Sequence, residues 1–212
     1  MIQIKKAYLQ YPSLEFPTID IEDLQFTWTG ISTLAGPSGS GKTSLFRLLA
    51  GWFEPSENSL CDFGGHHITT NDIRMVGAHA SLLPWFTVKK NIILQTKNRL
   101  SRPVKKLLQQ VGLLNKTGLL YPYELSLGMY KRVELIIAVE QNPKLLFLDE
   151  LFTSLDDKAR SHVKAYINER RNSLMTMISA HEKGLSVSIG DTKSYELVLQ
   201  SESGTVKGIK LL

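Results

Sequence analysis

The sequence is poor in cysteine and lacks long apolar runs. Its 212 residues include one cysteine, Cys61, which excludes an intramolecular disulfide framework and a metal site built from several thiolates. No stretch of about 18 consecutive apolar residues occurs, so no transmembrane helix is expected. The N-terminal residues MIQIKKAYLQYP also lack the continuous apolar core of a secretory signal peptide. We therefore expect a chain that is neither secreted by this route nor embedded in a membrane.

Acidic side chains are missing from one long segment. Residues 73–123 contain no aspartate or glutamate. The basic residues of this segment are Arg74, Lys89, Lys90, Lys97, Arg99, Arg102, Lys105, Lys106 and Lys116. Because the formal net charge of the whole chain is only +5, the remainder of the chain is net acidic. This asymmetry fits a nucleic-acid surface, an anionic membrane surface or a solvated helical face, and charge alone leaves all three open.

Apolar runs and turn residues predict an α/β fold. Length and composition fit one large domain, which we expect to span residues 1–212. Short or alternating apolar runs predict strands at residues 2–9, 19–26, 31–35, 59–63, 73–76, 145–148, 174–178 and 195–199. Helical spacing predicts helices at residues 42–50, 87–96, 104–111, 126–141 and 157–170. Their order indicates a mainly parallel core sheet covered by helices, an N-terminal antiparallel β portion, and a helical subdomain inserted at about residues 80–140.

A glycine-rich motif gives the strongest functional signal. Residues 36–43 match G-x-x-x-x-G-K-[ST] and lie between a predicted strand and a predicted helix, as expected of a P-loop NTPase. Lys42 would neutralise β/γ-phosphate charge, and the Thr43 hydroxyl would bind Mg²⁺. The alternative is a glycine-rich turn with an incidental lysine, which the flanking strand and helix disfavour. The residues predicted to bind nucleotide here are Gly36, Ser38, Gly39, Ser40, Gly41, Lys42, Thr43 and Ser44.

A second signal lies at the end of a predicted strand. Residues 144–150 read KLLFLDE, an apolar run that ends in two adjacent carboxylates. Successive side chains of a strand diverge, so Asp149 and Glu150 can have different roles. In P-loop proteins the first acid holds Mg²⁺, and a nearby acid can polarise the attacking water. Alone, such a pair is more often a helix cap or a solvated turn, but combined with the phosphate loop it favours catalysis.

The remaining motifs resemble those of the ATP-binding-cassette (ABC) ATPases, in the family's order and across nearly the whole chain. Residues 125–132 (LSLGMYKR) resemble the signature sequence L-S-G-G-Q, and residues 154–156 (SLD) resemble the D-loop, with Asp156 as its acid. His181 resembles the switch histidine that contacts the γ-phosphate. Tyr11 resembles the aromatic residue that stacks on adenine.

This resemblance implies a mechanism. Its cofactors are ATP and Mg²⁺, with Thr43 and Asp149 at the metal, and its catalytic residues are Glu150, His181 and Lys42. In the family two nucleotide domains pair head to tail, so Ser126 and Gly128 would act on the ATP of a partner. A second ATPase subunit is therefore an expected partner, as a homodimer when ATP is bound.

The resemblance also implies membrane partners. Residues 81–92 resemble the stretch through which the family's helical subdomain contacts integral membrane subunits. Their sequence most resembles that of importers of small solutes. Trp85, Phe86 and Val88 interrupt the basic charge with apolar groups, which suits a protein groove better than nucleic acid. We expect a cytoplasmic protein, peripheral on the inner face of the cell membrane, and no nucleic-acid partner.

Several positions depart from the family's pattern. Ala78 stands where its glutamine is expected, with His79 next. Leu127, Met129 and Leu151 replace a signature glycine, the signature glutamine and a proline after the catalytic acid. These departures bear on coupling and turnover more than on the chemistry.

Two other functions are weighed against transport. A soluble ABC-type ATPase acting on nucleic acid or ribosomes would use the basic segment as its binding face, but such relatives usually carry two cassettes or a long coiled-coil insertion. A small kinase or GTPase would leave the signature motif and His181 as coincidences. Neither the transported solute nor the direction of transport follows from the residues themselves.

Overall fold

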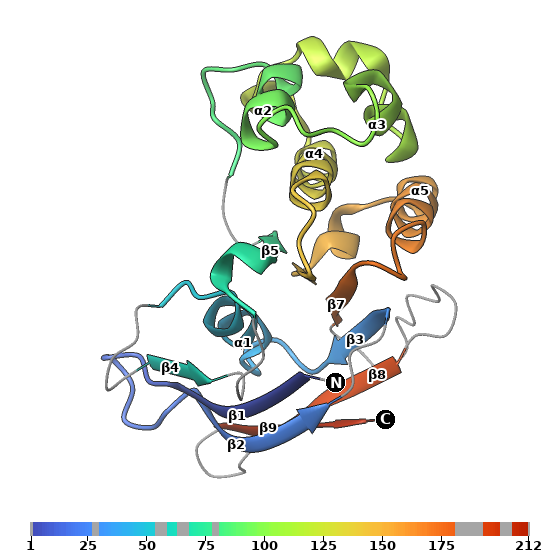
Figure 1. Cartoon of the computed structure of the whole chain (residues 1–212). Coiled ribbons are helices and arrows are strands. Elements are labelled where there is room, and N and C mark those ends of the chain that lie inside the picture. The colour runs from blue at the N-terminus through green and yellow to red at the C-terminus, as the bar shows by residue number, and fades with distance from the viewer. Residues whose placement is uncertain are drawn as a thin grey trace.

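A computed structural model of the chain describes residues 2–26, 30–53, 59–62, 68–77, 81–180, 193–199 and 205–211. Within these residues one mixed sheet forms the base of the molecule and helices stack on it (Figure 1). The strands are β1 (Ile2–Leu9), β2 (Ile19–Phe26), β3 (Ile31–Ala35), β4 (Ser59–Asp62), β5 (Ile73–Val76), β6 (Leu145–Leu148), β7 (Met175–Ala180), β8 (Lys193–Leu199) and β9 (Val206–Leu211). Their order across the sheet is β4-β1-β2-β9-β8-β3-β7-β6-β5.

The core of the sheet is parallel, as predicted. β3 pairs in parallel with β7 and β8, and β6 pairs in parallel with β5 and β7. Since parallel strands end at the same edge of a sheet, the loops after β3, β5 and β6 meet there. The sheet order therefore brings the glycine-rich loop, Gly77 and the acidic pair to one place.

The N-terminal portion is antiparallel, which confirms the prediction, but one strand was missed. β1 pairs antiparallel with β2 and with β4. β9 lies between β2 and β8, parallel to β2 through Ile19 and Val206 and antiparallel to β8. Its alternation of apolar and polar residues is short and is interrupted by Gly208, which weakens a strand signal. The strand nevertheless joins the antiparallel portion to the parallel core.

The helices lie within about two residues of their predicted ends. They are α1 (Lys42–Leu49), α2 (Val88–Gln95), α3 (Val104–Gln110), α4 (Leu127–Glu140) and α5 (Asp157–Asn168). Three begin with a side-chain cap: Thr87, Ser126 and Asp156 accept hydrogen bonds from the backbone N–H groups of Lys90, Met129 and Ala159. Among the described helices, none combines the length and the apolar character that crossing a membrane requires.

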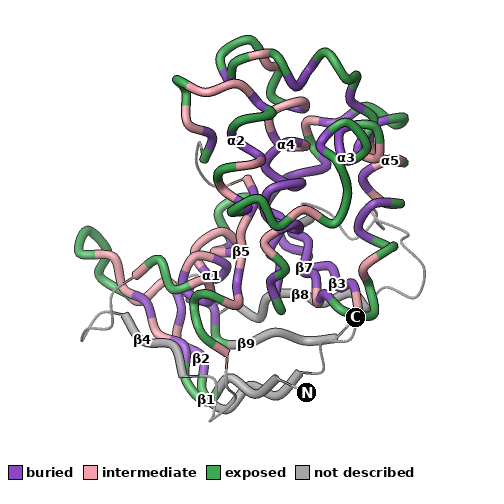
Figure 2. Tube along the Cα trace, turned by 45° about the horizontal axis from the view of Figure 1, so that its top comes forward, coloured by how far each residue is buried: buried purple, intermediate pink, exposed green. Residues whose placement is uncertain are grey.

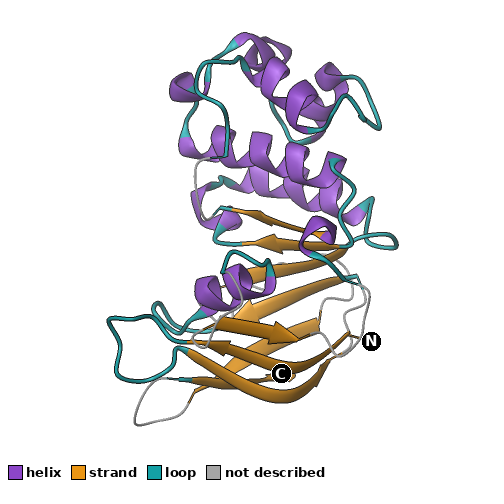
Figure 3. Cartoon of the chain, turned by 60° about the vertical axis from the view of Figure 1, so that its left-hand side comes forward, coloured by secondary structure: helices purple, strands orange, loops and turns teal. Residues whose placement is uncertain are grey.

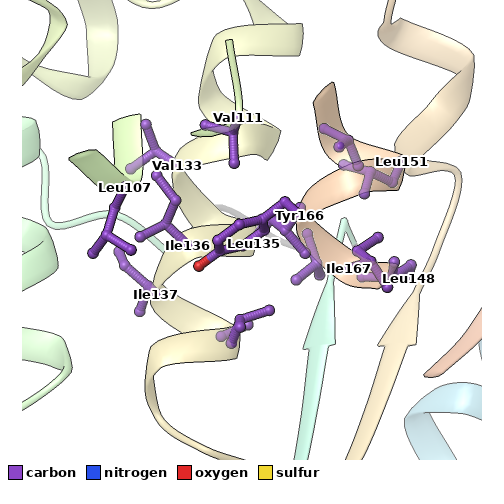
Figure 4. Close-up of a cluster of buried hydrophobic side chains, with 14 of the residues drawn as sticks. Leu107, Val111, Val133, Leu135, Ile136, Ile137, Leu148, Leu151, Tyr166 and Ile167 are labelled. Carbon is purple, nitrogen blue, oxygen red and sulfur yellow. The ribbon is translucent and has the colours of Figure 1, made fainter. Parts of the chain in front are cut away.

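Two hydrophobic clusters cover the two faces of the parallel strands. Along β6, Leu146 and Leu148 belong to one cluster, and Leu145 and Phe147 to the other, as the alternation of strand side chains dictates. The first cluster joins β6 to α2, α3, α4 and α5, and Figure 4 shows part of it between α4 and α5. The second packs α1 against the sheet. Figure 3 shows the helical layer rising above the strands, and Figure 2 shows buried stretches of α4 within that layer.

A buried polar group also ties the helical layer together. Glu140, near the end of α4, accepts hydrogen bonds from Arg170 Nη2 at 2.6 Å and from the Ser101 N–H at 2.6 Å. The hydroxyl of Tyr166 donates to the same carboxylate at 3.2 Å. A buried carboxylate is tolerated only with such partners, so Glu140 holds α4, α5 and the loop before α3 in one arrangement.

Candidate functional site

The glycine-rich loop connects β3 to α1. The chain leaves β3 at Ala35, turns through residues 36–41 and enters α1 at Lys42. Gly41 has a φ of 92°, in the left-handed region that favours glycine, and a Cβ at Gly36 would lie 2.8 Å from Ser40 Oγ, so that hydroxyl would have to shift. No side chain of the described residues caps α1. The N–H groups of its first turn therefore remain available to an anion.

Lys42 is folded into this loop. The residue is only 6% exposed, and its Nζ donates to the carbonyl oxygens of Gly36 at 2.6 Å and Pro37 at 2.7 Å. Burial lowers the pKa of the Lys42 ammonium, and the negative charges of Asp149 and Glu150 act in the opposite direction. The loop thus holds a cation close to both carboxylates of the acidic pair.

Asp149 accepts hydrogen bonds from hydroxyls of two other elements. It is buried directly after β6. Thr43 Oγ1, on α1, donates to Asp149 Oδ2 at 2.7 Å. Ser179 Oγ, on the neighbouring strand β7, donates to Asp149 Oδ1 at 2.8 Å. Asp149 and Thr43, separated widely in the sequence, are therefore direct neighbours, as the metal-site prediction requires.

Glu150 lies at the same cavity as the loop. It is exposed and precedes the 3₁₀ turn η4 (Leu151–Ser154). The cavity has a volume of about 170 Å³. Its lining residues are Thr18, Ser38, Gly39, Ser40, Gly41, Lys42, Thr43, Ser44 and Glu150. A concave surface lined by backbone amides, hydroxyls, one ammonium and one carboxylate is suited to a polyphosphate chain.

The side-chain oxygens and amides of this site fit Mg²⁺ and a nucleoside triphosphate. Mg²⁺ prefers oxygen ligands and keeps several waters, so one hydroxyl and one carboxylate are a sufficient protein share. Thr43 and Asp149 supply these oxygens, and Ser179 fixes the orientation of the carboxylate from behind. Within the described ranges no group of three or more His, Cys, Asp or Glu side chains forms a metal site.

Tyr11 and Thr18 lie beside this cavity. The Tyr11 hydroxyl is 3.2 Å from Ser44 Oγ, and its ring packs edge-on against Phe53 with centroids 5.9 Å apart. Thr18 lines the cavity, and its buried Oγ1 has no hydrogen-bond partner among the described residues. A buried hydroxyl without a partner is costly, so Thr18 is a candidate contact for the bound ligand.

The residues of the predicted signature lie apart from this cavity. Ser126 is exposed at the start of α4. Gly128 is buried, and a Cβ there would lie 2.6 Å from the Ser154 carbonyl oxygen. Asp156 is exposed and caps α5. None of these three is among the described residues that line the cavity. In a single chain they therefore do not reach its own phosphate loop.

The departures from the family's pattern have distinct environments. Leu127 is 64% exposed next to Ser126, Met129 packs partly against the first cluster, and Leu151 is buried in it. Three residues singled out in the sequence, Ala78, His79 and His181, lie outside the described residues.

Four contributors to the site were not predicted. Ser179 and Thr18 are ordinary hydroxyl residues whose role depends on neighbouring strands and loops. Lys131 donates from α4 to the carbonyl oxygen of Glu150 at 2.9 Å. Gly77 lets the chain after β5 approach Asp149 closely. Of these, only the glycine just after a predicted strand carried a signal in the sequence.

Replacing Gly77 with alanine should destabilise the fold. Gly77 has a φ of 104°, and an added Cβ would lie 2.1 Å from the carbonyl oxygen of Asp149. The left-handed conformation alone costs roughly 1–3 kcal/mol for other residues, and the clash adds to it. Chemical denaturation should show a loss well above that of the control Gly30→Ala, whose φ is 74° but whose Cβ would have a contact of 3.7 Å. Equal losses in the two variants would mean that the backbone at Asp149 moves aside freely.

Comparisons with known proteins point to one family. A family model described as ABC transporter matches residues 22–153. The sulfate/thiosulfate import ATP-binding protein CysA of Mesostigma viride is 34% identical over 188 residues, which cover 83% of this chain and 54% of that protein. The Fe(3+) ions import ATP-binding protein FbpC 2 of Rhizobium meliloti is 33% identical over 196 residues, covering 86% of this chain and 48% of that protein. The chain thus spans about half the length of the curated relatives it matches.

A solved structure has the same fold. The dimeric structure of MJ0796, a bacterial ABC transporter cassette, superimposes with a TM-score of 0.77 at 19% sequence identity, covering 100% of this chain and 99% of that chain. At this identity the likeness concerns the fold.

Proposed function

This chain belongs to the ABC transporter family, and from that premise we propose that it is an ATP-binding subunit that hydrolyses MgATP to drive a small solute across a membrane. One observation carries the proposal: Thr43 on α1 donates a hydrogen bond to Asp149 while Lys42 and Glu150 line the same cavity. These are the groups that phosphoryl transfer to water needs, namely a phosphate cradle, a metal site and a carboxylate base.

Each group has a separate task in hydrolysis. The loop amides and Lys42 bind the β/γ-phosphates, and Tyr11 contacts the adenine ring of ATP. Thr43 and Asp149 hold Mg²⁺, which when bound neutralises part of the phosphate charge. Glu150 accepts a proton from the water that attacks the γ-phosphate. The bond between the γ-phosphorus and the bridging oxygen breaks on the opposite side, and ADP leaves with that oxygen.

A second copy of the chain completes each site. Ser126 is exposed and lies away from its own phosphate loop, so it and the neighbouring Gly128 serve the ATP of the partner. Asp156 and His181, the latter by resemblance, act at the same junction. ATP shared by two surfaces favours the closed dimer, and hydrolysis releases it.

A loop before α2 is the docking surface for integral membrane subunits. Trp85 is 66% exposed, and Lys90 Nζ lies 4.1 Å from the centre of the Phe86 ring. Buried Asn91 fixes the loop, because its Oδ1 accepts from the Leu83 N–H at 2.7 Å and its Nδ2 donates to the Phe86 carbonyl at 2.9 Å. A rigid loop that presents one aromatic side chain is a suitable anchor for a protein groove.

One detail of the docking prediction is wrong. Val88 was expected to add an apolar group to this surface, but it is fully buried in the first cluster because the first turn of α2 faces the core. In this proposal the protein docks at the inner face of the membrane. The helical subdomain comprises approximately residues 80–140.

Trp85→Ala should weaken association with the membrane subunits about 30-fold, because an exposed aromatic anchor typically contributes about 2 kcal/mol or more to binding. ATP affinity should stay nearly unchanged, since Trp85 does not line the phosphate cavity. Co-purification and nucleotide titration of the same preparation give both values. The control is Trp52→Ala, which removes an exposed tryptophan after α1. The pair Lys89→Glu and Lys90→Glu should chiefly slow association and reduce its dependence on salt, because salt screens the attraction that these charges provide.

Full retention of the membrane subunits by Trp85→Ala, together with tight DNA binding that depends on Lys89 and Lys90, would instead favour the soluble alternative. One member of the basic segment, Arg102, forms an ion pair with Glu169 at 3.1 Å.

The proposed function is tested by phosphate release from ATP by the purified chain. We expect hydrolysis that requires Mg²⁺, stops when the metal is chelated, and does not respond to duplex DNA. A folded chain that binds no ATP would contradict the proposal, and DNA-stimulated hydrolysis would promote the soluble alternative.

A further inference from the structure

The backbone of Glu150 adopts a conformation that its side chain does not favour. Its φ and ψ are 50° and 26°, in the left-handed region. For a residue other than glycine this conformation costs roughly 1–2 kcal/mol. It persists only where the surroundings fix it, and such positions are concentrated at active sites.

Three hydrogen bonds fix the peptide groups of Glu150. Its N–H donates to Ser179 Oγ at 2.9 Å. Its carbonyl oxygen accepts from Thr153 Oγ1 at 2.7 Å and from Lys131 Nζ at 2.9 Å. Thr153 is a local partner in η4, and Ser179 belongs to the neighbouring strand. Lys131 alone reaches this carbonyl from α4, in the helical layer.

Lys131 is an unusual choice for this position if its role is only to fill space. It is 8% exposed, although lysine is rarely buried. Its long chain runs toward the junction of β6 and η4, where a charged donor makes a stronger hydrogen bond than a neutral one. An apolar side chain of similar length would satisfy the packing without the cost of burying a charge.

A second buried polar side chain on α4, that of Glu134, binds Ser81. Glu134, three residues after Lys131 and therefore on the same helix face, is buried. Its Oε1 accepts from Ser81 Oγ at 2.7 Å and from the Ser81 N–H at 3.3 Å. Burial raises the pKa of Glu134, whereas Ser81 and the charge of Lys131 lower it. One turn of α4 thus contacts both the acidic pair and the start of the docking loop.

We propose that Lys131 is a positioning residue for hydrolysis: it holds the carbonyl of Glu150 so that the Glu150 side chain faces the phosphate cavity. This inference rests on the proposed function, in which Glu150 is the base. Lys131 does not line the phosphate cavity, so in this proposal it acts only through the backbone of Glu150.

The position of Lys131 on α4 gives the contact a second consequence. α4 begins directly after Ser126, which in the proposed function faces the ATP of a partner subunit. Lys131 follows five residues later, about 7.5 Å along the helix axis. A shift of α4 when the partner's nucleotide engages Ser126 therefore moves the donor that holds this chain's own Glu150.

The test compares steady-state ATP hydrolysis by the wild-type chain and three variants of Lys131. Lys131→Met keeps the length and removes the donor, Lys131→Gln keeps a shorter polar group, and Lys131→Arg keeps a charged donor. We expect Lys131→Met and Lys131→Gln to lower kcat about 10- to 100-fold with KM changed less than about twofold, and Lys131→Arg to recover part of kcat. If Lys131→Met does not fold, the comparison of Lys131→Gln with Lys131→Arg decides alone.

A matched control separates positioning from stability. Glu140→Gln weakens another buried contact of α4 and should lower the unfolding temperature, but it should leave kcat unchanged because Glu140 is remote from the cavity lining. A fall in kcat for Glu140→Gln equal to that of Lys131→Met would overturn the positioning role.

The outcomes also separate this inference from the proposed function. Wild-type hydrolysis that depends on Glu150 but is unaffected by Lys131→Met and Lys131→Gln would refute the role of Lys131 and leave the proposed function standing. A wild-type chain that hydrolyses no ATP would remove both.

Discussion

Replacing Glu150 with glutamine should slow MgATP hydrolysis by about 10²–10⁴-fold while ATP binding is retained, which is the range expected for the loss of a general base. The amide keeps the size of the side chain but cannot accept the proton of the attacking water. The neighbours Lys131, Thr153 and Ser179 all bind the backbone of Glu150, so the substitution should leave the local structure in place. Because ATP then persists, MgATP should also accumulate a dimer.

Three measurements on one preparation check this prediction. Phosphate release gives the rate, nucleotide titration gives the affinity, and size analysis with MgATP gives the oligomeric state. Glu15→Gln is the control, since it makes the same chemical change on the exposed loop between β1 and β2. Turnover near the wild-type rate, with only monomer present, would show that Glu150 is not the base and that ATP does not join two subunits.

Lys42→Ala should abolish hydrolysis and weaken ATP binding by about 100-fold or more, because charge-assisted hydrogen bonds to phosphate contribute roughly 1.5–3 kcal/mol each. Before nucleotide binds, Lys42 donates to the carbonyls of Gly36 and Pro37. Its removal therefore also loosens the loop, with an expected fall in the unfolding midpoint of about 2–4 °C, the shift that about 1 kcal/mol produces in a chain of this size.

Nucleotide titration and thermal unfolding distinguish these two effects of Lys42→Ala. The control is Lys158→Ala, an exposed lysine on α5, which should change neither quantity. Hydrolysis at the wild-type rate by a folded Lys42→Ala protein would remove the phosphate-loop interpretation of residues 36–43.

The parts of the fold that local chemistry determines were predictable. The phosphate loop is a local pattern, because glycines, a lysine and a hydroxyl at fixed spacing lie between one strand and one helix. The starts of α2, α4 and α5 were equally accessible, since Thr87, Ser126 and Asp156 are residues that cap helices. The fold class followed from the alternation of such elements.

The parts that depend on contacts between distant segments were not predictable. Val88 reads as a surface residue among lysines, and only the packing of α2 shows that it faces the core. β9 has a weak pattern of its own and is defined by its neighbours β2 and β8. The contact of Lys131 with Glu150 joins a helix to a strand end, and periodicity carries no information on which carbonyl a buried lysine will find.

The sheet order has a consequence for the synthesis of this protein. The strand that leads into the phosphate loop is made well before its neighbours, because the partners of Ile31 and Ser32 in the sheet are Thr176 and Lys193. At about 5–20 residues per second, a ribosome needs roughly 7–32 s to make the chain between them. Contacts within residues 81–140 are much closer in sequence, so the helical layer can begin to form while β3 still lacks both neighbours. ATP in the cell therefore cannot help this domain to fold until β7 and β8 have been translated.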